Sequence, residues 1–170
     1  MILYLDTSAL LKLYVVEKGR DVVEQAVDEA AVIATSSVAY AEARASLARK
    51  QREGVFSDEE LYEAVTAFEE DWQTFEKLTA TENVARLAGN LAEKHALRGF
   101  DAIHLASALL VRVAAQEEAE ESGEDSTRFL SFDGDLSQAA SKTMLTYEAE
   151  PETEPQEDED RGGEDSTQDS

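Results

Sequence analysis

The sequence contains no cysteine, which excludes disulfide scaffolds, zinc sites built from thiolates and cysteine nucleophiles. Any metal ion would therefore be held by oxygen or histidine ligands. The chain also lacks a run of 18 uncharged apolar residues, and no basic segment precedes an apolar stretch at the N-terminus. We therefore expect a cytoplasmic protein without a membrane span or an export signal.

Basic residues are also few. Lysine and arginine number 15 against 38 acidic residues, which gives a formal net charge of −23. Residues 148–170 hold 11 acids and one base, so residues 1–147 still carry −13. With six lysines, nine arginines and abundant alanine, the chain resembles proteins from salt-rich cytoplasm, where salt screens self-repulsion. Thermal stability should therefore rise between low and molar KCl.

The composition predicts one folded domain followed by a tail. A chain of 170 residues with 42% hydrophobic content can close a single core. We predict a domain over residues 1–147 and an acidic, disordered tail over 148–170, because the tail holds almost nothing apolar. Residues 116–127 are also polar and acidic, which predicts a mobile surface loop.

Short apolar runs alternate with helical patterns along the domain. The predicted strands are 2–5, 31–34, 77–80, 128–131 and 143–146, and the predicted helices are about 8–15, 20–30, 36–51, 57–76, 82–96 and 100–119. Residues 133–135 are predicted to form a turn. The alternation predicts an α/β sandwich, in which helices cover both faces of a mostly parallel sheet.

Two acidic residues follow predicted strands. Asp6 comes directly after strand 2–5, and Asp133 lies two residues after Ser131. Both should lie beyond the carboxyl ends of parallel strands, where such sheets bind their ligands. For either residue alone we favour a purely structural role, since aspartate is common at helix N-caps and in turns.

Two further acids lie in helical segments. Glu42 is inside an alanine-rich helix, where a buried carboxylate needs a partner, and a salt bridge to Arg98 or Arg49 would explain it equally well. Asp101 opens an otherwise apolar helix, and its charge would stabilise the helix N-terminus.

The conjunction of the four acids favours a metal site. Four carboxylates crowded at one sheet edge would raise each other's pKa unless a cation neutralised them. Mg²⁺ and Mn²⁺ prefer oxygen ligands and leave coordination positions for water and phosphate. Such ions promote phosphoryl transfer by activating water and stabilising charged oxygens.

Four segments together resemble those of the PIN-domain ribonucleases, most closely the VapC-like toxins of type II toxin–antitoxin systems. They read Leu-Asp6-Thr-Ser-Ala-Leu, Ser-Val-Ala-Tyr-Ala-Glu42, Leu-Arg-Gly-Phe-Asp101-Ala-Ile-His-Leu-Ala and Leu-Ser-Phe-Asp133-Gly-Asp-Leu. Their order and spacing match the family over residues 1–147, and the acidic tail lies outside the resemblance.

The resemblance implies a PIN-like three-layer fold with a five-stranded parallel sheet and a ribonuclease that depends on Mg²⁺ or Mn²⁺. Asp6 and Asp101 would be the principal metal ligands, and Glu42 and Asp133 would complete the catalytic pocket. The family also implies a VapB-like antitoxin partner and a homodimer of the toxin.

The resemblance also suggests roles for three more residues. Ser8 would support the carboxylate of Asp6, and Ser131 occupies a similar place before Asp133. Asp135 competes as the fourth acid, although its position before Leu136 fits a turn better.

The remaining polar candidates have ordinary explanations that we favour. Arg49 and Arg98 would contact RNA phosphate or form ion pairs, and ion pairs are the commoner outcome. His104 would be a general base or a hydrogen-bonded core residue, and the core role is favoured on an apolar helix. Trp72, with Phe68 and Phe75 at helical spacing, fits core or dimer packing better than base stacking.

Two other functions compete with a ribonuclease. A haloacid-dehalogenase-like phosphotransfer enzyme also places aspartate after its first strand, but it needs a second aspartate where this chain has Ser8. A catalytically silent PIN-like interaction module would keep the fold and use the acids structurally. The presence of all four acids favours the enzyme.

Overall fold

The computed structural model describes residues 1–118, 127–143 and 146–147. The predicted acidic tail and residues 119–126 of the predicted loop lie outside the described residues. Residues 116–118 belong to a helix rather than to the predicted loop. No helix in the described ranges is long and apolar enough to cross a membrane.

A five-stranded sheet forms the centre of the molecule, in the order β3-β2-β1-β4-β5. Every observed strand pair is parallel. The strands are β1 (Ile2–Leu5), β2 (Val32–Ser36), β3 (Glu76–Leu78), β4 (Thr127–Leu130) and the two-residue β5 (Thr146–Tyr147). The predicted parallel sheet is confirmed.

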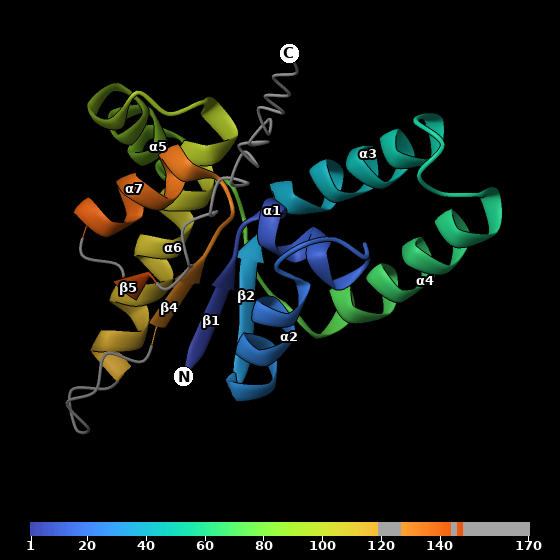
Figure 1. The fold of residues 1–170 in the computed structure, drawn as a ribbon. Coiled ribbons are helices and arrows are strands. Elements are labelled where there is room, and N and C mark those ends of the chain that lie inside the picture. The colour runs from blue at the N-terminus through green and yellow to red at the C-terminus, as the bar shows by residue number, and fades with distance from the viewer. Residues whose placement is uncertain (119–126, 144–145, 148–170) are drawn as a thin grey trace, which may run out of the picture.

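Helices cover both faces of this sheet (Figure 1). One layer contains α1 (Thr7–Leu10), the 3-10 helix η1 (Leu11–Leu13), α2 (Arg20–Glu29), α3 (Val38–Arg52) and α4 (Asp58–Thr74). The other layer contains α5 (Glu82–His95), α6 (Gly99–Glu118) and α7 (Gly134–Lys142). The three-layer α/β fold is therefore as predicted.

The alternation of side chains along β1 explains why this strand is central. Leu3 and Leu5 pack into the core shared with α1 to α4, whereas Tyr4 packs into the core shared with α5 to α7. All three are fully buried. A strand that is apolar on both faces needs a helical layer on each side.

The aromatic stripe of α4 is confirmed as core packing. Phe68 is fully buried and Phe75 is 4% exposed, and Trp72 packs against the same cluster. Ring centroids of Phe68 and Trp72 lie 5.5 Å apart. These rings hold α4 against α3 and the sheet.

The predicted turn at residues 133–135 is wrong, because Asp133 caps α7. Its side chain accepts a hydrogen bond from the Leu136 backbone amide at 2.9 Å. Leu136, Ala139 and Ala140 are buried at helical spacing. The polar residues at the start of this segment indicated a turn. The segment forms a helix because its apolar side chains, which begin three residues later, are buried on one helix face.

The other end of α7 also differs from the prediction. Thr143 is the C-cap of the helix rather than the start of a strand, and the strand lies at Thr146–Tyr147. Residues 144–145 of that predicted strand are outside the described part of the chain. Near the N-terminus, the predicted helix 8–15 is split into α1 and η1.

Gly19 joins the loop before α2 to the segment that follows β4. Its φ of +85° is in the left-handed region, and an added Cβ would lie 2.5 Å from the Phe132 ring. Glycine is therefore required both by the backbone and by the space. This contact fixes the residue between Ser131 and Asp133.

Candidate metal centre

Asp6 and Ser131 lie side by side where two neighbouring strands end. Leu5 of β1 is in register with Leu130 of β4, and the Asp6 amide donates to the Leu130 carbonyl at 3.2 Å. The residues that follow the two strands are thus fixed by sheet register. This is the carboxyl edge at which parallel sheets bind ligands.

The Asp6 carboxylate is almost enclosed, since the residue is only 4% exposed. The Ser8 hydroxyl donates at 2.8 Å, the Ser131 hydroxyl at 2.8 Å and the Ala9 amide at 2.9 Å. The Ala9 bond makes Asp6 the N-cap of α1. Asp6 therefore has the structural role that its position predicted, alongside any functional one.

Burial raises the pKa of Asp6, and the charge of His104 and the three hydrogen bonds oppose that shift. No lysine or arginine in the described residues is among the groups that lower it. Asp6 is thus a buried acid whose hydrogen-bond donors are neutral and whose pKa is lowered by the nearby charge of His104.

Ser8 and Ser131 also order the chain around Asp6. The Ser8 hydroxyl accepts a hydrogen bond from the Phe132 amide at 2.8 Å, and the Ser131 hydroxyl accepts one from the Asp133 amide at 3.1 Å. Each hydroxyl therefore donates to Asp6 while it accepts from the segment after β4. The two serines couple the position of Asp6 to that of Asp133.

Glu42 has partners other than the predicted arginines. Thr7 Oγ1 donates to Glu42 Oε2 at 2.7 Å, and His104 Nε2 lies 3.0 Å from the same oxygen. Burial alone would raise the pKa of this half-buried carboxyl, but the bonds from His104 and Thr7 outweigh it and lower the pKa. The alternative of a salt bridge to Arg98 or Arg49 is not found among the described residues, although the charge of Arg98 also lowers the pKa of Glu42.

His104 is the hydrogen-bonded core residue that the sequence favoured, at 2% exposure. Its Nδ1 lies 3.1 Å from the Tyr4 hydroxyl, and its Nε2 also lies 3.0 Å from Thr7 Oγ1. It is nevertheless part of the site, because its other contact is Glu42. Sequence reasoning missed Thr7 and Tyr4, although both are within two residues of Asp6.

Arg98 bridges the two remaining acids. Its Nε donates to Asp101 Oδ2 at 2.9 Å and its Nη2 donates to Asp133 Oδ2 at 2.8 Å. The Arg98 side chain is 79% exposed. An exposed guanidinium therefore offsets part of the negative charge of these two carboxylates.

The other candidates lie outside these contacts. The Arg49 side chain is 63% exposed, and its Nε is 3.9 Å from Glu53. Asp135 is exposed in the first turn of α7. Among the described residues, neither Arg49 nor Asp135 forms a hydrogen bond or ion pair with the four acids.

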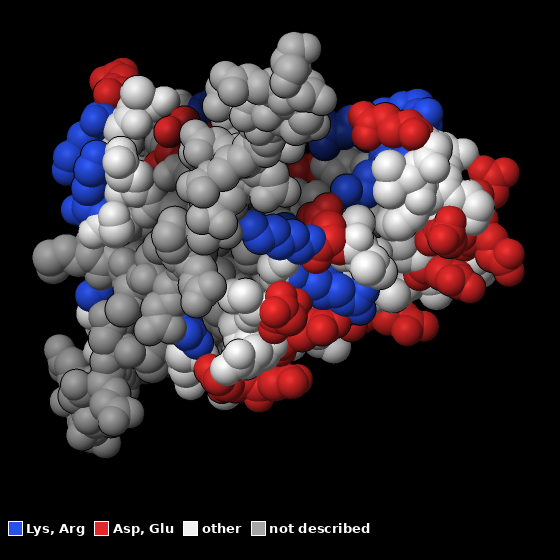
Figure 2. Space-filling model, viewed as in Figure 1, with Lys and Arg blue, Asp and Glu red and all other residues white. Residues whose placement is uncertain are grey.

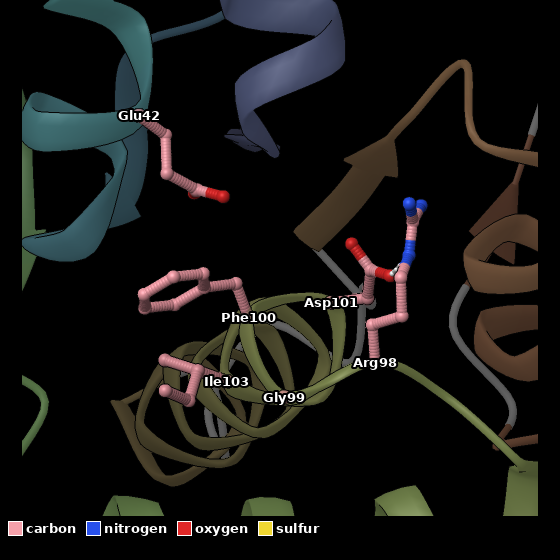
Figure 3. A pocket seen from close by; sticks show the side chains of 6 residues that line it. All are labelled: Glu42, Arg98, Gly99, Phe100, Asp101 and Ile103. Carbon is pink, nitrogen blue, oxygen red and sulfur yellow. Dashed lines mark hydrogen bonds and ion pairs between the residues drawn. The ribbon is translucent and has the colours of Figure 1, made fainter. Parts of the chain in front are cut away.

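An open cavity of about 500 Å³ lies between α3 and the start of α6 (Figure 3). Its lining residues are Glu42, Arg98, Gly99, Phe100, Asp101 and Ile103. Figure 3 shows Phe100 and Ile103 on the side that faces Glu42, with Asp101 and Arg98 on the other side. Asp6 and Asp133 stand outside this lining and are linked to it through Thr7 and Arg98.

The donor set fits a hard cation, since all four predicted ligands offer carboxylate oxygens. Among residues 1–118, 127–143 and 146–147, however, no three acidic or histidine side chains are close enough to hold an ion as they stand. Arg98 contacts Asp101 and Asp133, and His104 contacts Glu42. Shared binding of one ion would require some of these contacts to be exchanged.

Comparison with known proteins gives consistent results. The model of the PIN domain matches residues 3–142. Two proteins of Mycobacterium tuberculosis, Ribonuclease VapC45 and Ribonuclease VapC49, are each 39% identical over 110 residues, which cover 65% of this chain and 76% of each relative.

A solved structure shares the fold. The crystal structure of Mycobacterium tuberculosis VapC20, described as a toxin that cleaves the sarcin-ricin loop, aligns with a TM-score of 0.54. The alignment covers 81% of this chain and 94% of that chain at 16% sequence identity. At this identity the likeness supports the fold alone.

Proposed function

This chain belongs to the PIN domain family and is VapC-like, and from that premise we propose that it is a divalent-metal-dependent endoribonuclease, the toxin of a VapBC-like toxin–antitoxin pair. Its substrate is RNA, and it hydrolyses phosphodiester bonds. The cofactor is Mg²⁺ or Mn²⁺. The related ribonucleases support the activity, and the acidic edge of the sheet supports the choice of ion.

The observation that carries the proposal is the environment of Asp6. The Asp6 carboxylate is 4% exposed, and its hydrogen-bond donors are two hydroxyls and one amide, so when it is ionised its negative charge has no lysine or arginine as a hydrogen-bond partner among the described residues. Such a charge is costly unless a cation joins it. The cost is recovered when a metal ion binds.

Asp6 and Asp101 would be the principal ligands, and Glu42 and Asp133 would complete the site. A bound Mg²⁺ or Mn²⁺ supplies an activated water and stabilises charge on the phosphate oxygens. Ser8 and Ser131 hold the Asp6 carboxylate in a fixed orientation. Such outer partners are worth about 10- to 100-fold in activity at metal sites.

When RNA binds, the Arg98 side chain would leave the carboxylates of Asp101 and Asp133 and bind a phosphate of the substrate. It is exposed at the cavity, and a guanidinium can exchange a carboxylate for a phosphate without losing its hydrogen bonds. Arg49 would make a more remote phosphate contact along α3. The two arginines thus add binding to a site whose charge is otherwise acidic.

The family membership also supports partners and location. We infer a VapB-like antitoxin protein, a toxin homodimer and a cytoplasmic location. A catalytically silent PIN-like module is the alternative to the enzyme. The dehalogenase-like alternative is less favoured because Ser8, which would be its second aspartate, donates a hydrogen bond to Asp6.

Cleavage of a mixed RNA pool by the purified protein tests the function. The reaction is run in molar KCl with Mn²⁺, Mg²⁺ or EDTA, and the wild type is compared with Asp6→Asn, Asp133→Asn and the matched control Asp135→Asn. We expect metal-dependent cleavage that the first two variants lose and the control keeps. Cleavage that survives EDTA, or Mn²⁺ binding without cleavage of any RNA, would favour another function.

A further inference from the structure

The basic side chains of this protein are largely engaged in ion pairs. The pairs in the described residues include Lys12 and Lys50 with Glu17, Arg20 with Glu24, Arg44 with Glu69, Arg49 with Glu53, Arg86 with Glu82, Arg98 with Asp101 and Asp133, and Arg128 with Glu29. On the face drawn in Figure 2, blue side chains lie beside red ones rather than in a broad basic surface. With a net charge of −23, counterion release can contribute little to RNA binding.

One exposed aromatic side chain stands at the cavity. Phe100 is 55% exposed and lines the cavity together with Ile103. Of the six phenylalanines, Phe68, Phe75 and Phe129 are buried, and Phe100 alone is among the exposed large apolar residues. A single exposed apolar side chain is ordinary, but this one shares a cavity wall with a second apolar residue and is adjacent in sequence to Asp101.

The approach to the Phe100 ring is open. More than half of the Phe100 residue is exposed, and Gly99 before it adds no side chain to the cavity wall. Figure 3 shows the ring standing off the first turn of α6 on the side that faces Glu42. The ring therefore lies on the Glu42 side of the cavity, and Asp101 lies on the other side.

Building on the proposed ribonuclease function, we propose that Phe100, backed by Ile103, is a stacking platform for an unpaired nucleobase of the RNA next to the bond that is cleaved. Every base has a π-face, so stacking on an aromatic ring holds single-stranded RNA and does not need positive charge. Phe100 and Asp101 are adjacent in sequence and line the same cavity, so a base on Phe100 would belong to a nucleotide close to the proposed site of cleavage.

This platform also sets the class of RNA. A base within a duplex is already stacked and paired, and it would have to be extruded at a cost before it could reach the ring. The enzyme should therefore cleave single strands and loops and leave duplex RNA intact. Because stacking is not a charge interaction, this preference should persist in molar KCl.

Abasic substitution in a short single-stranded RNA with one cleaved bond tests the platform. Each nucleotide is replaced in turn, and KM and kcat are measured for the wild type, Phe100→Ala, Phe100→Trp and the control Tyr62→Ala, which removes an aromatic residue that is 73% exposed on α4. We expect Phe100→Ala to raise KM about 10- to 100-fold with little change in kcat. Phe100→Trp should restore KM, and Tyr62→Ala should behave like the wild type.

The abasic profile separates stacking from a general loss. In the wild type one position beside the cleaved bond should be sensitive, and in Phe100→Ala that position should lose its sensitivity. The fluorescence of a 2-aminopurine base at the same position should change on binding to the wild type and not on binding to Phe100→Ala. Thermal unfolding checks that both variants fold.

The failures are distinguishable. If the wild type cleaves the RNA and Phe100→Ala does so with the same KM and abasic profile, the platform is overturned while the ribonuclease function stands, and the apolar wall is left for a protein partner. If the wild type cleaves no RNA, both proposals fall.

Discussion

Asp6 and Asp101 lie at the same edge of the sheet, yet their carboxylates are held in different ways. On the Asp6 side, which comprises Asp6, Ser8 and Ser131, neutral donors surround a buried acid. On the Arg98 side, Asp101 and Asp133 share an exposed guanidinium. The first arrangement holds one carboxylate in a fixed position. In the second, an exposed arginine that can be displaced offsets part of the charge of two carboxylates. In the proposed metal site, both arrangements would favour uptake of a cation.

Asp6→Asn should break the Asp6 side and produce the largest effect. Cleavage should fall at least about 100-fold, because loss of a principal ligand exceeds the loss of an outer partner. The stability of the folded protein at neutral pH, in contrast, should rise in Asp6→Asn. Because burial raises the pKa of Asp6 in the folded state, its contribution to stability is complete below the unfolded pKa and is lost as pH rises through the folded pKa.

At neutral pH without metal, Asp6→Asn should therefore unfold at a higher temperature than the wild type. Thermal unfolding across pH measures this, and the difference should disappear as pH falls below the unfolded pKa. Asp101→Asn is the matched change on the Arg98 side, and it should lose cleavage without gaining stability. A lower unfolding temperature for Asp6→Asn would contradict the cost assigned to its buried charge.

His104→Ala tests whether Glu42 depends on the imidazole. It removes a buried ring and leaves the Tyr4 hydroxyl and Glu42 without that partner, so the free energy of unfolding should fall by about 2–4 kcal/mol. Cleavage should fall about 10- to 100-fold because Glu42 loses its orientation. Urea unfolding and single-turnover cleavage give the two values.

Two variants serve as controls for His104. His95→Ala removes the other histidine, which lies on α5 without contact to the four acids, and it should leave cleavage intact. His104→Gln retains a hydrogen-bond donor and should recover part of both losses. If His104→Gln were fully stable and His104→Ala cleaved RNA at the wild-type rate, Glu42 would not need this support.

Arg98→Gln tests the Arg98 side of the comparison. Removal of a positive charge beside two carboxylates should tighten Mn²⁺ binding about threefold to tenfold, while RNA cleavage falls about tenfold. Isothermal titration with Mn²⁺ measures the first effect without any turnover. Arg86→Gln, which breaks an exposed pair with Glu82 on α5, should change neither. Unchanged Mn²⁺ affinity in Arg98→Gln would mean that the guanidinium does not compete with the ion.

Glu17 gives the smallest effect and shows what an ordinary paired acid does. Burial would raise its pKa, but hydrogen bonds and charges from Lys50 and Lys12 outweigh this and lower the pKa from 4.5. Its contribution to stability is therefore present above the unfolded pKa and is lost as pH falls through the folded pKa. Glu17→Gln should cost within about 1 kcal/mol at neutral pH and nothing in strong acid.

The pH dependence of Glu17→Gln thus has the opposite sign to that of Asp6→Asn. Urea unfolding of both variants between acidic and neutral pH makes the comparison. If both differences from the wild type had the same sign, Asp6 would be a paired acid like Glu17.

Much of the fold could be predicted from the sequence because its patterns are local. The apolar run 2–5 ends at Asp6, and the resulting strand and helix start are where they were expected. The segment at 133–142 was missed as a helix because Gly134 and Asp135 suggested a turn, whereas burial of Leu136 and Ala139 depends on packing against α6. That packing is a tertiary effect.

The site was predictable in its acids and less so in their partners. Asp6, Glu42, Asp101 and Asp133 are identifiable from position and family pattern. The contact between Glu42 and His104 joins residues 62 positions apart, and register between β1 and β4 brings Ser131 to Asp6. No local pattern carries that information.

Metal occupancy and cleavage measured on the same samples test the central claim most directly. Bound Mn²⁺ is followed by electron paramagnetic resonance, and the rate of cleavage of one defined RNA is followed over the same range of Mn²⁺. We predict that both rise and saturate together in the wild type and that Asp101→Asn weakens both. Cleavage that is independent of Mn²⁺, or Mn²⁺ binding that none of the four acids affects, would contradict a carboxylate-bound ion as the basis of the activity.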